Sequence, residues 1–190
     1  YPGIPEAIAD LNSQGVGTGG VVFNIAAGHI DTASNIVISI TSNLPTSANT
    51  VTFQKSGAGS NPLIVAAPGT SAFSDGIIKL SGADYITFDA IDIYDPNTGE
   101  SNERMEWGYA LLRASATDGT HHSVIKNCSV TLQKSYTVSV GIVILNRDTS
   151  GNVVVALDSN GQNNYNRIFG NNISQVYRGI LVQSPSTSRD

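Results

Sequence analysis

The hydrophobic positions divide the chain into one helical segment and a series of short strands. In residues 4–13, Ile4, Ile8 and Leu11 recur at the spacing of a helical face, and Gly15 follows as a stop signal. Beyond it the apolar runs are only a few residues long, and Gly, Asn, Asp, Ser or Pro separates them. The pattern predicts one short N-terminal helix and then strands, the first at 21–25, 36–40, 51–53, 63–65, 77–80 and 86–88.

Two strand patterns alternate along the chain and repeat. The first opens with Gly and continues as an alternating strand, starting at positions 76, 108, 141 and 179, at intervals of 32, 33 and 38 residues. The second has two apolar residues separated by four positions, at intervals of 39 and 43 residues: Ile86 with Ile91, Ile125 with Val130, and Ile168 with Ile173. One order of strands thus recurs about every 32 to 43 residues, which is typical of a solenoid.

A repeated short strand cannot bury its apolar stripe alone. Stacking it in parallel on the equivalent strand of the next turn completes the backbone ladder and forms a continuous interior. The sequence therefore predicts an all-β fold, a parallel β-helix in which Ile86 lies in line with Ile125. Asn127 and the pair at 171–172 are expected at bends, because Asn tolerates a left-handed backbone.

The predicted domain is a single unit over residues 1–190. Residues 1–15 form a capping helix over an open end of the coils, and residues 16–190 form the coils, with loop insertions near 95–107 and 148–165. The main alternative is an antiparallel sandwich or jelly roll, which would favour tight hairpins and would not require equivalent residues to recur in register.

Composition narrows the partners. The 190 residues carry 15 acidic and 10 basic side chains, a formal charge of -5, without a cluster of Lys or Arg. This balance argues against nucleic acid and anionic lipid as partners. No apolar run approaches the roughly 18 residues of a membrane span. Cys128 is the only cysteine, so an intramolecular disulfide is impossible, and its apolar neighbours predict a packed thiol.

Five motifs occur in order over about residues 1–135. They are Leu-Asn-Ser-Gln-Gly-Val at 11–16, Gly-Val-Val-Phe-Asn at 20–24 with Ala-Gly at 27–28, Phe-Gln-Lys-Ser-Gly-Ala-Gly at 53–59 with Asn-Pro at 61–62, Ala-Asp-Tyr-Ile-Thr-Phe-Asp at 83–89 and Ile-Lys-Asn-Cys at 125–128. Together they resemble the N-terminal part of large secreted proteins of Bacteroidota. Those are right-handed parallel β-helices of the pectin-lyase-like superfamily, and many carry a C-terminal type IX secretion sorting domain.

The resemblance has several implications. It implies a right-handed coil, an extracellular or cell-surface location, and the type IX secretion machinery as a partner. It also implies that residues 1–190 are the leading coils of a longer protein. Where that family often has Phe-Asp-Gly, this chain has Phe88-Asp89-Ala90, so a slightly different bend is expected after Asp89.

The densest polar segment, residues 95–107, supplies the candidate binding residues. An aromatic ring beside charged groups is a common way to hold a sugar or a cation, and a glycan site is predicted from the following residues: Trp107, Tyr109, Glu103, Glu106 and Arg104. A weaker Ca²⁺ site is predicted from hard oxygen ligands at Asp95, Asn97 and Glu100, although the order of an EF-hand is not met. An ordinary solvated loop is the alternative.

Other polar groups offer less. The four acids Asp84, Asp89, Asp92 and Asp95 are close in sequence, and solvated bends and strand faces account for them. His121 and His122 are adjacent, so in extended chain they point opposite ways and are expected to be surface residues rather than a metal pair. The second insertion carries Asp158, Asn160 and Asn163, for which the same two interpretations hold.

The function is left between two classes. A strong repeat without a convergent catalytic set favours a non-catalytic secreted or cell-surface module with a structural or adhesive role, binding a polysaccharide or surface glycan through its loops. The alternative is the N-terminal part of a polysaccharide lyase or glycoside hydrolase, with the active coils downstream. A lyase would use Ca²⁺ held by acids and a basic residue that abstracts a proton, whereas a hydrolase needs converging carboxylates.

Overall fold

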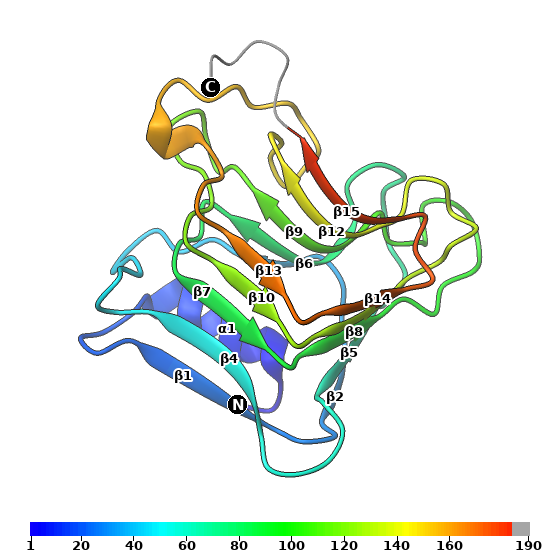
Figure 1. Ribbon diagram of the computed structural model, residues 1–190, viewed down its shortest axis with the longest axis horizontal. Helices are drawn as coiled ribbons and strands as arrows, with labels where there is room; N and C mark the ends of the chain where they lie inside the picture. Colours follow the sequence, from blue (N-terminus) through cyan, green and yellow to red (C-terminus); the bar gives the residue numbers. More distant parts are fainter. Residues whose placement is uncertain (184–190) are drawn as a thin grey trace.

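The computed structural model describes residues 1–183, and residues 184–190 of the expected domain lie outside the described residues. The strands of residues 1–183 form three parallel sheets of five strands each (Figure 1). Sheet A contains β1 (Val21–Ala26), β4 (Val51–Ser56), β7 (Ile86–Asp89), β10 (Val124–Lys126) and β13 (Arg167–Phe169). Sheet B contains β2 (Ile30–Thr32), β5 (Leu63–Val65), β8 (Asp92–Tyr94), β11 (Ser129–Thr131) and β14 (Asn172–Ser174). Sheet C contains β3 (Ile36–Ile38), β6 (Gly76–Ser81), β9 (Trp107–Leu112), β12 (Val140–Leu145) and β15 (Arg178–Gln183).

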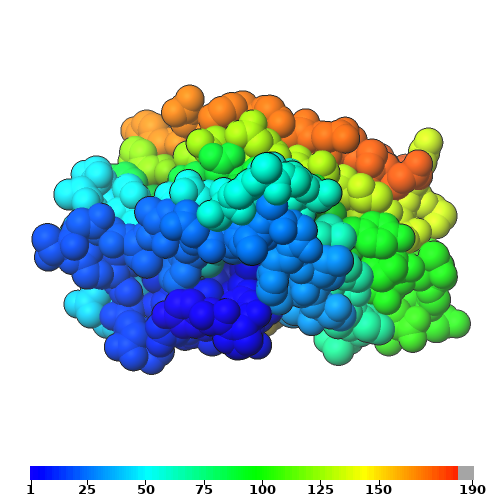
Figure 2. All heavy atoms as spheres, turned by 90° about the horizontal axis from the view of Figure 1, so that it is seen from below, coloured from blue at the N-terminus to red at the C-terminus, as the bar shows by residue number. Residues whose placement is uncertain are grey.

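The chain visits the three sheets in a fixed order. It runs through A, B and C, then returns to A beside the strand it left one pass earlier, so each strand pairs with the strand three elements away. All pairs between the named strands of residues 1–183 are parallel. The all-β expectation is confirmed, and the antiparallel alternative is wrong. Figure 2 shows the passes as successive bands of colour, from blue through green to orange.

The register corrects the predicted columns. Ile125 pairs with Phe88 and Ile168, whereas Ile86 pairs with Val51 in the preceding pass. Val130 likewise pairs with Ile93 rather than with Ile91. A shift of two residues keeps every side chain on the same face of a strand, and it also keeps the five-residue spacing, so the apolar pattern fits either register.

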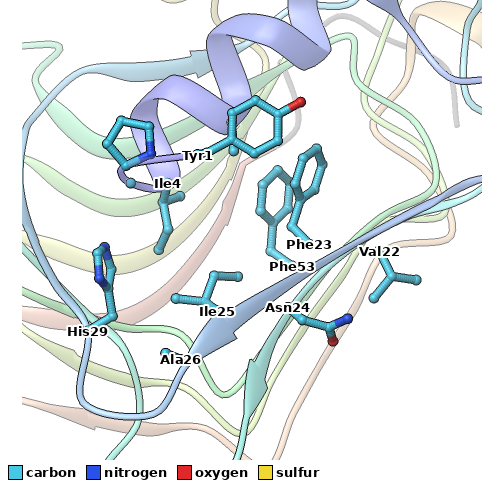
Figure 3. Close-up of a pocket in the computed structure, with 12 residues that line it drawn as sticks. Tyr1, Ile4, Val22, Phe23, Asn24, Ile25, Ala26, His29 and Phe53 are labelled. Carbon is cyan, nitrogen blue, oxygen red and sulfur yellow. The ribbon is translucent and has the colours of Figure 1, made fainter.

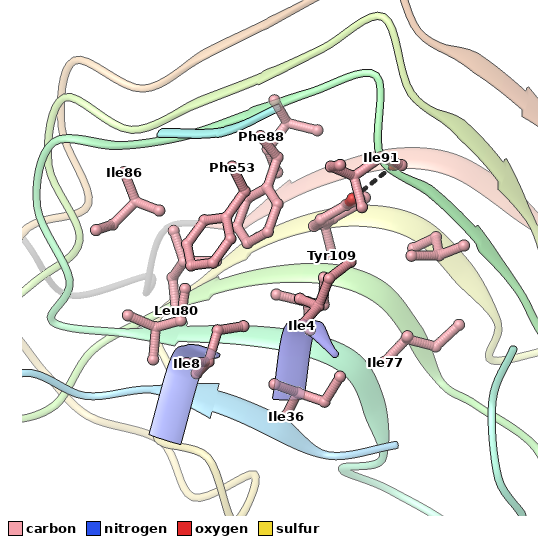
Figure 4. Close-up of a cluster of buried hydrophobic side chains, with 14 of the residues drawn as sticks. Ile4, Ile8, Ile36, Phe53, Ile77, Leu80, Ile86, Phe88, Ile91 and Tyr109 are labelled. Atoms are coloured by element: carbon pink, nitrogen blue, oxygen red, sulfur yellow. Dashed lines mark hydrogen bonds between the residues drawn. The ribbon is translucent and has the colours of Figure 1, made fainter. Parts of the chain in front are cut away.

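The N-terminal helix α1 (Ile4–Gln14) packs its apolar face on the interior beside β3. Ile4, Ala7, Ile8 and Leu11 are buried, and the Asp31 carboxylate accepts a hydrogen bond from the Ile4 N–H at 2.9 Å, which satisfies one free donor at the helix start. Figure 4 shows Ile4 and Ile8 facing Ile36 and Leu80, side chains that this short helix contributes to the common interior. Within residues 1–183 no helix is long and apolar enough to cross a membrane.

Aromatic rings form a column through the interior. Phe23 stacks on Phe53 at 4.6 Å between ring centroids, and Phe53 on Phe88 at 5.0 Å. The Tyr109 ring follows at a tilt, 5.3 Å from Phe88, and its hydroxyl donates to the Ile91 carbonyl at 2.8 Å (Figure 4). Phe23, Phe53 and Phe88 lie at equivalent positions of successive passes in sheet A, so the ladder spacing of about 4.8 Å sets their separation, whereas Tyr109 reaches the column from sheet C.

Each of three successive bends between sheets A and B contains one residue with a left-handed backbone conformation. Ala90, Asn127 and Gly170 have φ of 58°, 56° and 67°. The bend after Asp89 therefore does not differ from its neighbours, and Ala90 adopts a conformation that favours Gly or Asn. Asn171 follows the last of these bends, and its side chain donates to the Ile125 carbonyl and accepts from the Cys128 N–H.

In sheet C, strands β6, β9 and β12 are covered on both faces. A second apolar cluster lies on the face away from the interior: Trp107, Ala110, Leu112, Val140, Val143 and Leu145. The segment 146–158 crosses this face, where the Lys79 ammonium donates to the Thr149 carbonyl and the Arg113 guanidinium to the Val154 carbonyl. The face of sheet C away from the interior is therefore a small core in its own right.

The glycine column of sheet C is a packing requirement. Gly108 and Gly141 lie one above the other, but Gly76 pairs with Trp107 and is one position out of the predicted column. A Cβ on Gly141 would lie 2.5 Å from Cγ2 of Ile173 and 2.8 Å from the Gly179 carbonyl oxygen, closer than real Cβ contacts allow. A Cβ on Gly179 would meet nothing within 4 Å.

We expect Gly141→Ala to lower the free energy of unfolding by about 1–3 kcal/mol, because the added methyl overpacks the join between sheets B and C. Gly179→Ala, in the same column but with open space, is the matched control and should change it by less than about 0.5 kcal/mol. Urea denaturation followed by circular dichroism measures both. Equal effects of the two substitutions would contradict the proposed role of the column.

Candidate functional site

The predicted aromatic platform at residues 103–109 is not on the surface. Trp107 is only 5% exposed and lies in the outer cluster of sheet C, while Tyr109 is completely buried in the interior. Glu106 is also buried, Glu103 is exposed, and the Arg104 guanidinium donates to the carbonyls of its own loop. The five residues are therefore not assembled as one binding surface. Strand β9 is buried on both faces, which places Trp107 and Tyr109 out of reach of a ligand.

The predicted Ca²⁺ ligands serve the loop itself. One oxygen of the buried Asp95 carboxylate accepts from the backbone N–H and side-chain amide of Asn97, at 2.9 and 2.7 Å. The other oxygen accepts from the Met105 N–H at 2.9 Å, and Glu100 is exposed. Within residues 1–183 no group of three or more His, Cys, Asp or Glu side chains is arranged to hold a metal. The Asp95 carboxylate therefore joins the two ends of the loop through these hydrogen bonds.

The other acids named from sequence have separate partners. Asp89 forms an ion pair with Lys126 at 3.0 Å and accepts from the Asn127 amide. Asp92 accepts from the Ser129 N–H at 2.7 Å and from the Asn61 amide. They therefore serve the bends and strand faces and do not converge on one point.

Glu106 is the centre of a buried polar network on the outer side of sheet C. Its carboxyl accepts from the Asp75 N–H at 2.7 Å and from the Tyr136 hydroxyl, and the Tyr136 hydroxyl also lies 3.2 Å from the Ala72 carbonyl. Burial is the main cause that, with the nearby charge of Asp75, raises the pKa of Glu106 to about 7, against three hydrogen bonds that lower it, from Tyr136, Asp75 and its own backbone. Burial also lowers the pKa of Lys79 in the same region. The network joins three loop segments and opens onto no described cavity.

A hollow of about 400 Å³ lies at the N-terminal end, between α1 and β1 (Figure 3). Its walls are mainly apolar, with Ile4, Phe23 and Phe53 on the inner side. His29, which precedes β2, also lines the hollow, and its Nε2 lies 3.1 Å from Asp31. This hollow lies where the helix only partly fills the end of the interior, and it lacks converging polar groups.

A second aromatic column lies on the surface, at the turn from sheet C to sheet A. The rings of Tyr85, His122 and Tyr165 stack with centroid distances of 4.7 and 4.8 Å and interplanar angles of 8°. All three residues have positive φ, 54°, 52° and 60°, and they lie in the turns one or two positions before β7, β10 and β13. Tyr165 is 74% exposed. The column presents Tyr165 to solvent at its end.

A polar cleft of about 290 Å³ lies beside this column. Its lining combines the three stacked rings with Asp84 and His121 from the same turns, and with Ser159, Asn160 and Asn164 from the 148–165 insertion, which contains the short 3-10 helix η1 (Ser159–Gly161). The Asp158 side chain caps this helix by accepting from the Gly161 N–H at 3.0 Å. Three passes of the chain and one insertion therefore build the cleft.

Asp84 and His121 are paired at the floor of the turn. One Asp84 oxygen accepts from the His121 N–H at 2.6 Å and lies 3.2 Å from its Nδ1. Burial raises the pKa of Asp84, and the hydrogen bonds and charge from His121 oppose that rise. Within the described residues, the second Asp84 oxygen has no hydrogen-bonding partner, and it can accept a hydrogen bond from a ligand hydroxyl.

Sequence reasoning named part of this cleft without recognising it. The two adjacent histidines do have different partners, Asp84 for His121 and the tyrosine rings for His122. Asn160 was named within the second insertion, and Asn163, named with it, instead bridges the backbone of Thr120 and Leu145. Tyr85 and Tyr165 were missed. The available signal was an aromatic residue directly before the equivalent strand of three successive passes.

A comparison of the chain with models of protein families, with curated protein sequences and with solved structures finds no match. The chemistry of the cleft therefore carries the functional argument.

Glu106→Gln tests the buried network. A carboxyl whose pKa is raised in the folded state adds stability below its unfolded pKa of about 4.5, and that contribution is lost as the pH rises through about 7. We expect wild type to lose about 2–3 kcal/mol more than Glu106→Gln between pH 4.5 and pH 8, because Gln stays neutral. Its amide oxygen can accept from the Asp75 N–H, and its NH2 can donate to the Tyr136 oxygen while that hydroxyl donates to the Ala72 carbonyl.

Urea denaturation across that pH range measures the difference, with Glu100→Gln on the exposed part of the loop as the control that should parallel wild type. Identical pH profiles for wild type and Glu106→Gln would show that folding does not raise the pKa of Glu106.

Proposed function

We propose that this chain is a β-helix module of an extracellular or cell-surface protein, and that it binds a glycan in the cleft beside Tyr85, His122 and Tyr165. The single observation that carries the proposal is this cleft, in which stacked aromatic rings adjoin carboxylate, hydroxyl and amide groups. Sugars present hydroxyls around an apolar ring face, so they match a site that offers both kinds of surface.

The strand order supports a right-handed parallel β-helix. The chain passes through sheets A, B and C in the same order five times within residues 1–183, always returning beside its previous strand. Parallel strands joined by a crossover in one sheet take the right-handed connection in nearly all proteins, so we assign that hand to the coil. A location outside the cell and export by the type IX secretion machinery are part of the proposal, and they rest on the sequence resemblance alone.

The ring of Tyr165 is the proposed stacking surface for the sugar. One of its faces stacks on His122, and most of the side chain remains in solvent. Its position is held by the column below it and by the ladder of β13 on β10. A ring that is already ordered loses little freedom on binding, which favours affinity.

The polar groups of the cleft complement that ring. Asn160 makes no side-chain hydrogen bond to other described residues, and the Asn164 amide donates to Gln162, which leaves its carbonyl oxygen for a ligand. Together with Asp84 they provide acceptors and donors that can distinguish the arrangement of sugar hydroxyls.

A polysaccharide lyase or hydrolase is the second class retained from the sequence. Such activity requires carboxylates that converge on the scissile bond. The acids of residues 84–95 each have their own partners, and Asp84 is the acid among them that lines the cleft. The described residues thus support binding more than catalysis.

Tyr165→Ala should weaken glycan binding about 3- to 10-fold, because it removes the exposed ring while leaving the polar groups in place. Retention on an array of neutral, amino and uronate oligosaccharides would identify ligands, and titration calorimetry with the best of them would measure the loss. Tyr177→Ala is the matched control, since Tyr177 is 51% exposed at a different turn and should bind like wild type.

The proposal fails if wild type retains none of these oligosaccharides, or if Tyr165→Ala and Tyr177→Ala both bind as wild type does.

A further inference from the structure

The charges around the cleft are predominantly acidic. Asp84 lines it. The Asp118 carboxylate lies nearby, next to Gly82, which is in the same turn as Asp84. The pKa of Asp118 is raised by burial and then by the negative charge of Asp84, so the two carboxylates lie within reach of each other's field. Asp158 caps the 3-10 helix that forms the opposite wall. The remaining ionisable side chains that line the cleft are His121, His122 and the two tyrosines.

No Lys or Arg lines the cleft in the described part of the chain. The nearest cations along the sequence are engaged elsewhere: the Arg167 guanidinium lies 5.1 Å from the Phe169 ring, and Lys126 is paired with Asp89. Proteins that bind carboxylate sugars pair the sugar's acid with Arg or Lys, since a partly buried negative charge needs such a partner. This cleft offers no such partner.

We infer that the cleft selects neutral or amino sugars and rejects uronates and other acidic sugars. This inference rests on the proposed function and names its ligand class. The free Asp84 oxygen can accept a hydrogen bond from a hydroxyl, and a bond to a charged acceptor is about twice as strong as one between neutral groups. The ammonium of an amino sugar would gain a favourable charge interaction at the same place, and a uronate carboxylate would be repelled.

The test compares three ligands that share one skeleton: oligosaccharides of galactose, of galactosamine and of galacturonate. Titration calorimetry at low salt should show binding of the neutral and amino sugars and at least roughly 10-fold weaker binding of the uronate. Raising the ionic strength from about 0.01 M to about 1 M should reduce both the amino-sugar advantage and the uronate penalty, because salt screens exposed charges.

Asp84→Asn isolates the charge. Asn keeps an oxygen that accepts from the His121 N–H, so the turn should hold, and a thermal melt checks this. The substitution should narrow the ratio of neutral-sugar to uronate affinity by about 3- to 10-fold. Glu100→Gln makes the same change in net charge on an exposed loop and should leave the ratio as in wild type.

The outcomes separate the two levels of the proposal. Uronate binding as tight as neutral binding in wild type, or a ratio that Asp84→Asn leaves unchanged while salt also has no effect, overturns the inference but leaves a glycan site in place. Absence of binding by all three ligands and by the wider array overturns the proposed function, and the inference with it.

Discussion

The backbone ladder between successive passes is the constraint on which this molecule depends. Leu63 pairs with Asp92, and Val124 with Arg167, so partners are 29 to 43 residues apart in the chain. A pass therefore has no complete set of hydrogen bonds until its neighbours are in place. Where the ladder is interrupted at the bends, side chains take over: Asn163, Asn166 and Asn171 each bond two backbone groups of the preceding pass.

Both aromatic columns follow from the same ladder. Strands of one sheet are about 4.8 Å apart, which is close to the stacking distance of flat rings, so aromatic residues at equivalent positions stack without further adjustment. Inside, the result is the run Phe23, Phe53 and Phe88. At the turn from sheet C to sheet A the same spacing stacks Tyr85, His122 and Tyr165 on the surface. The candidate site is thus a product of the repeat, with its other wall supplied by an insertion.

The sequence was sufficient for the class of fold and for the N-terminal helix, because apolar spacing reports directly on which face is buried. It was insufficient for the register at Ile86, since a shift of two residues preserves both the buried face and the spacing. The turn at Ala90 could not be predicted either, because an Ala gives no sign of a left-handed backbone that the stacking of passes imposes.

The site was harder to predict than the fold. The loop at 95–107 looks like a surface because it is polar, but Trp107 and Glu106 lie beneath other segments that cover sheet C, and only the three-dimensional structure brings those segments together. Conversely, Tyr85 and Tyr165 lie in ordinary turns, 80 positions apart, and nothing in the sequence around either residue indicates that both stack on His122.

The covering of sheet C makes the three flanks of the molecule unequal. Its insertions thicken one flank, while strands of A and B keep an uncovered outward face of alternating side chains. A long polymer lying alongside this molecule would meet the bulky insertions on the flank of sheet C and the even strand surfaces on the flanks of sheets A and B. The cleft lies at the boundary between the covered flank of sheet C and the uncovered flank of sheet A. Longer or shorter insertions would therefore reshape one wall of the cleft and leave the aromatic wall as it is.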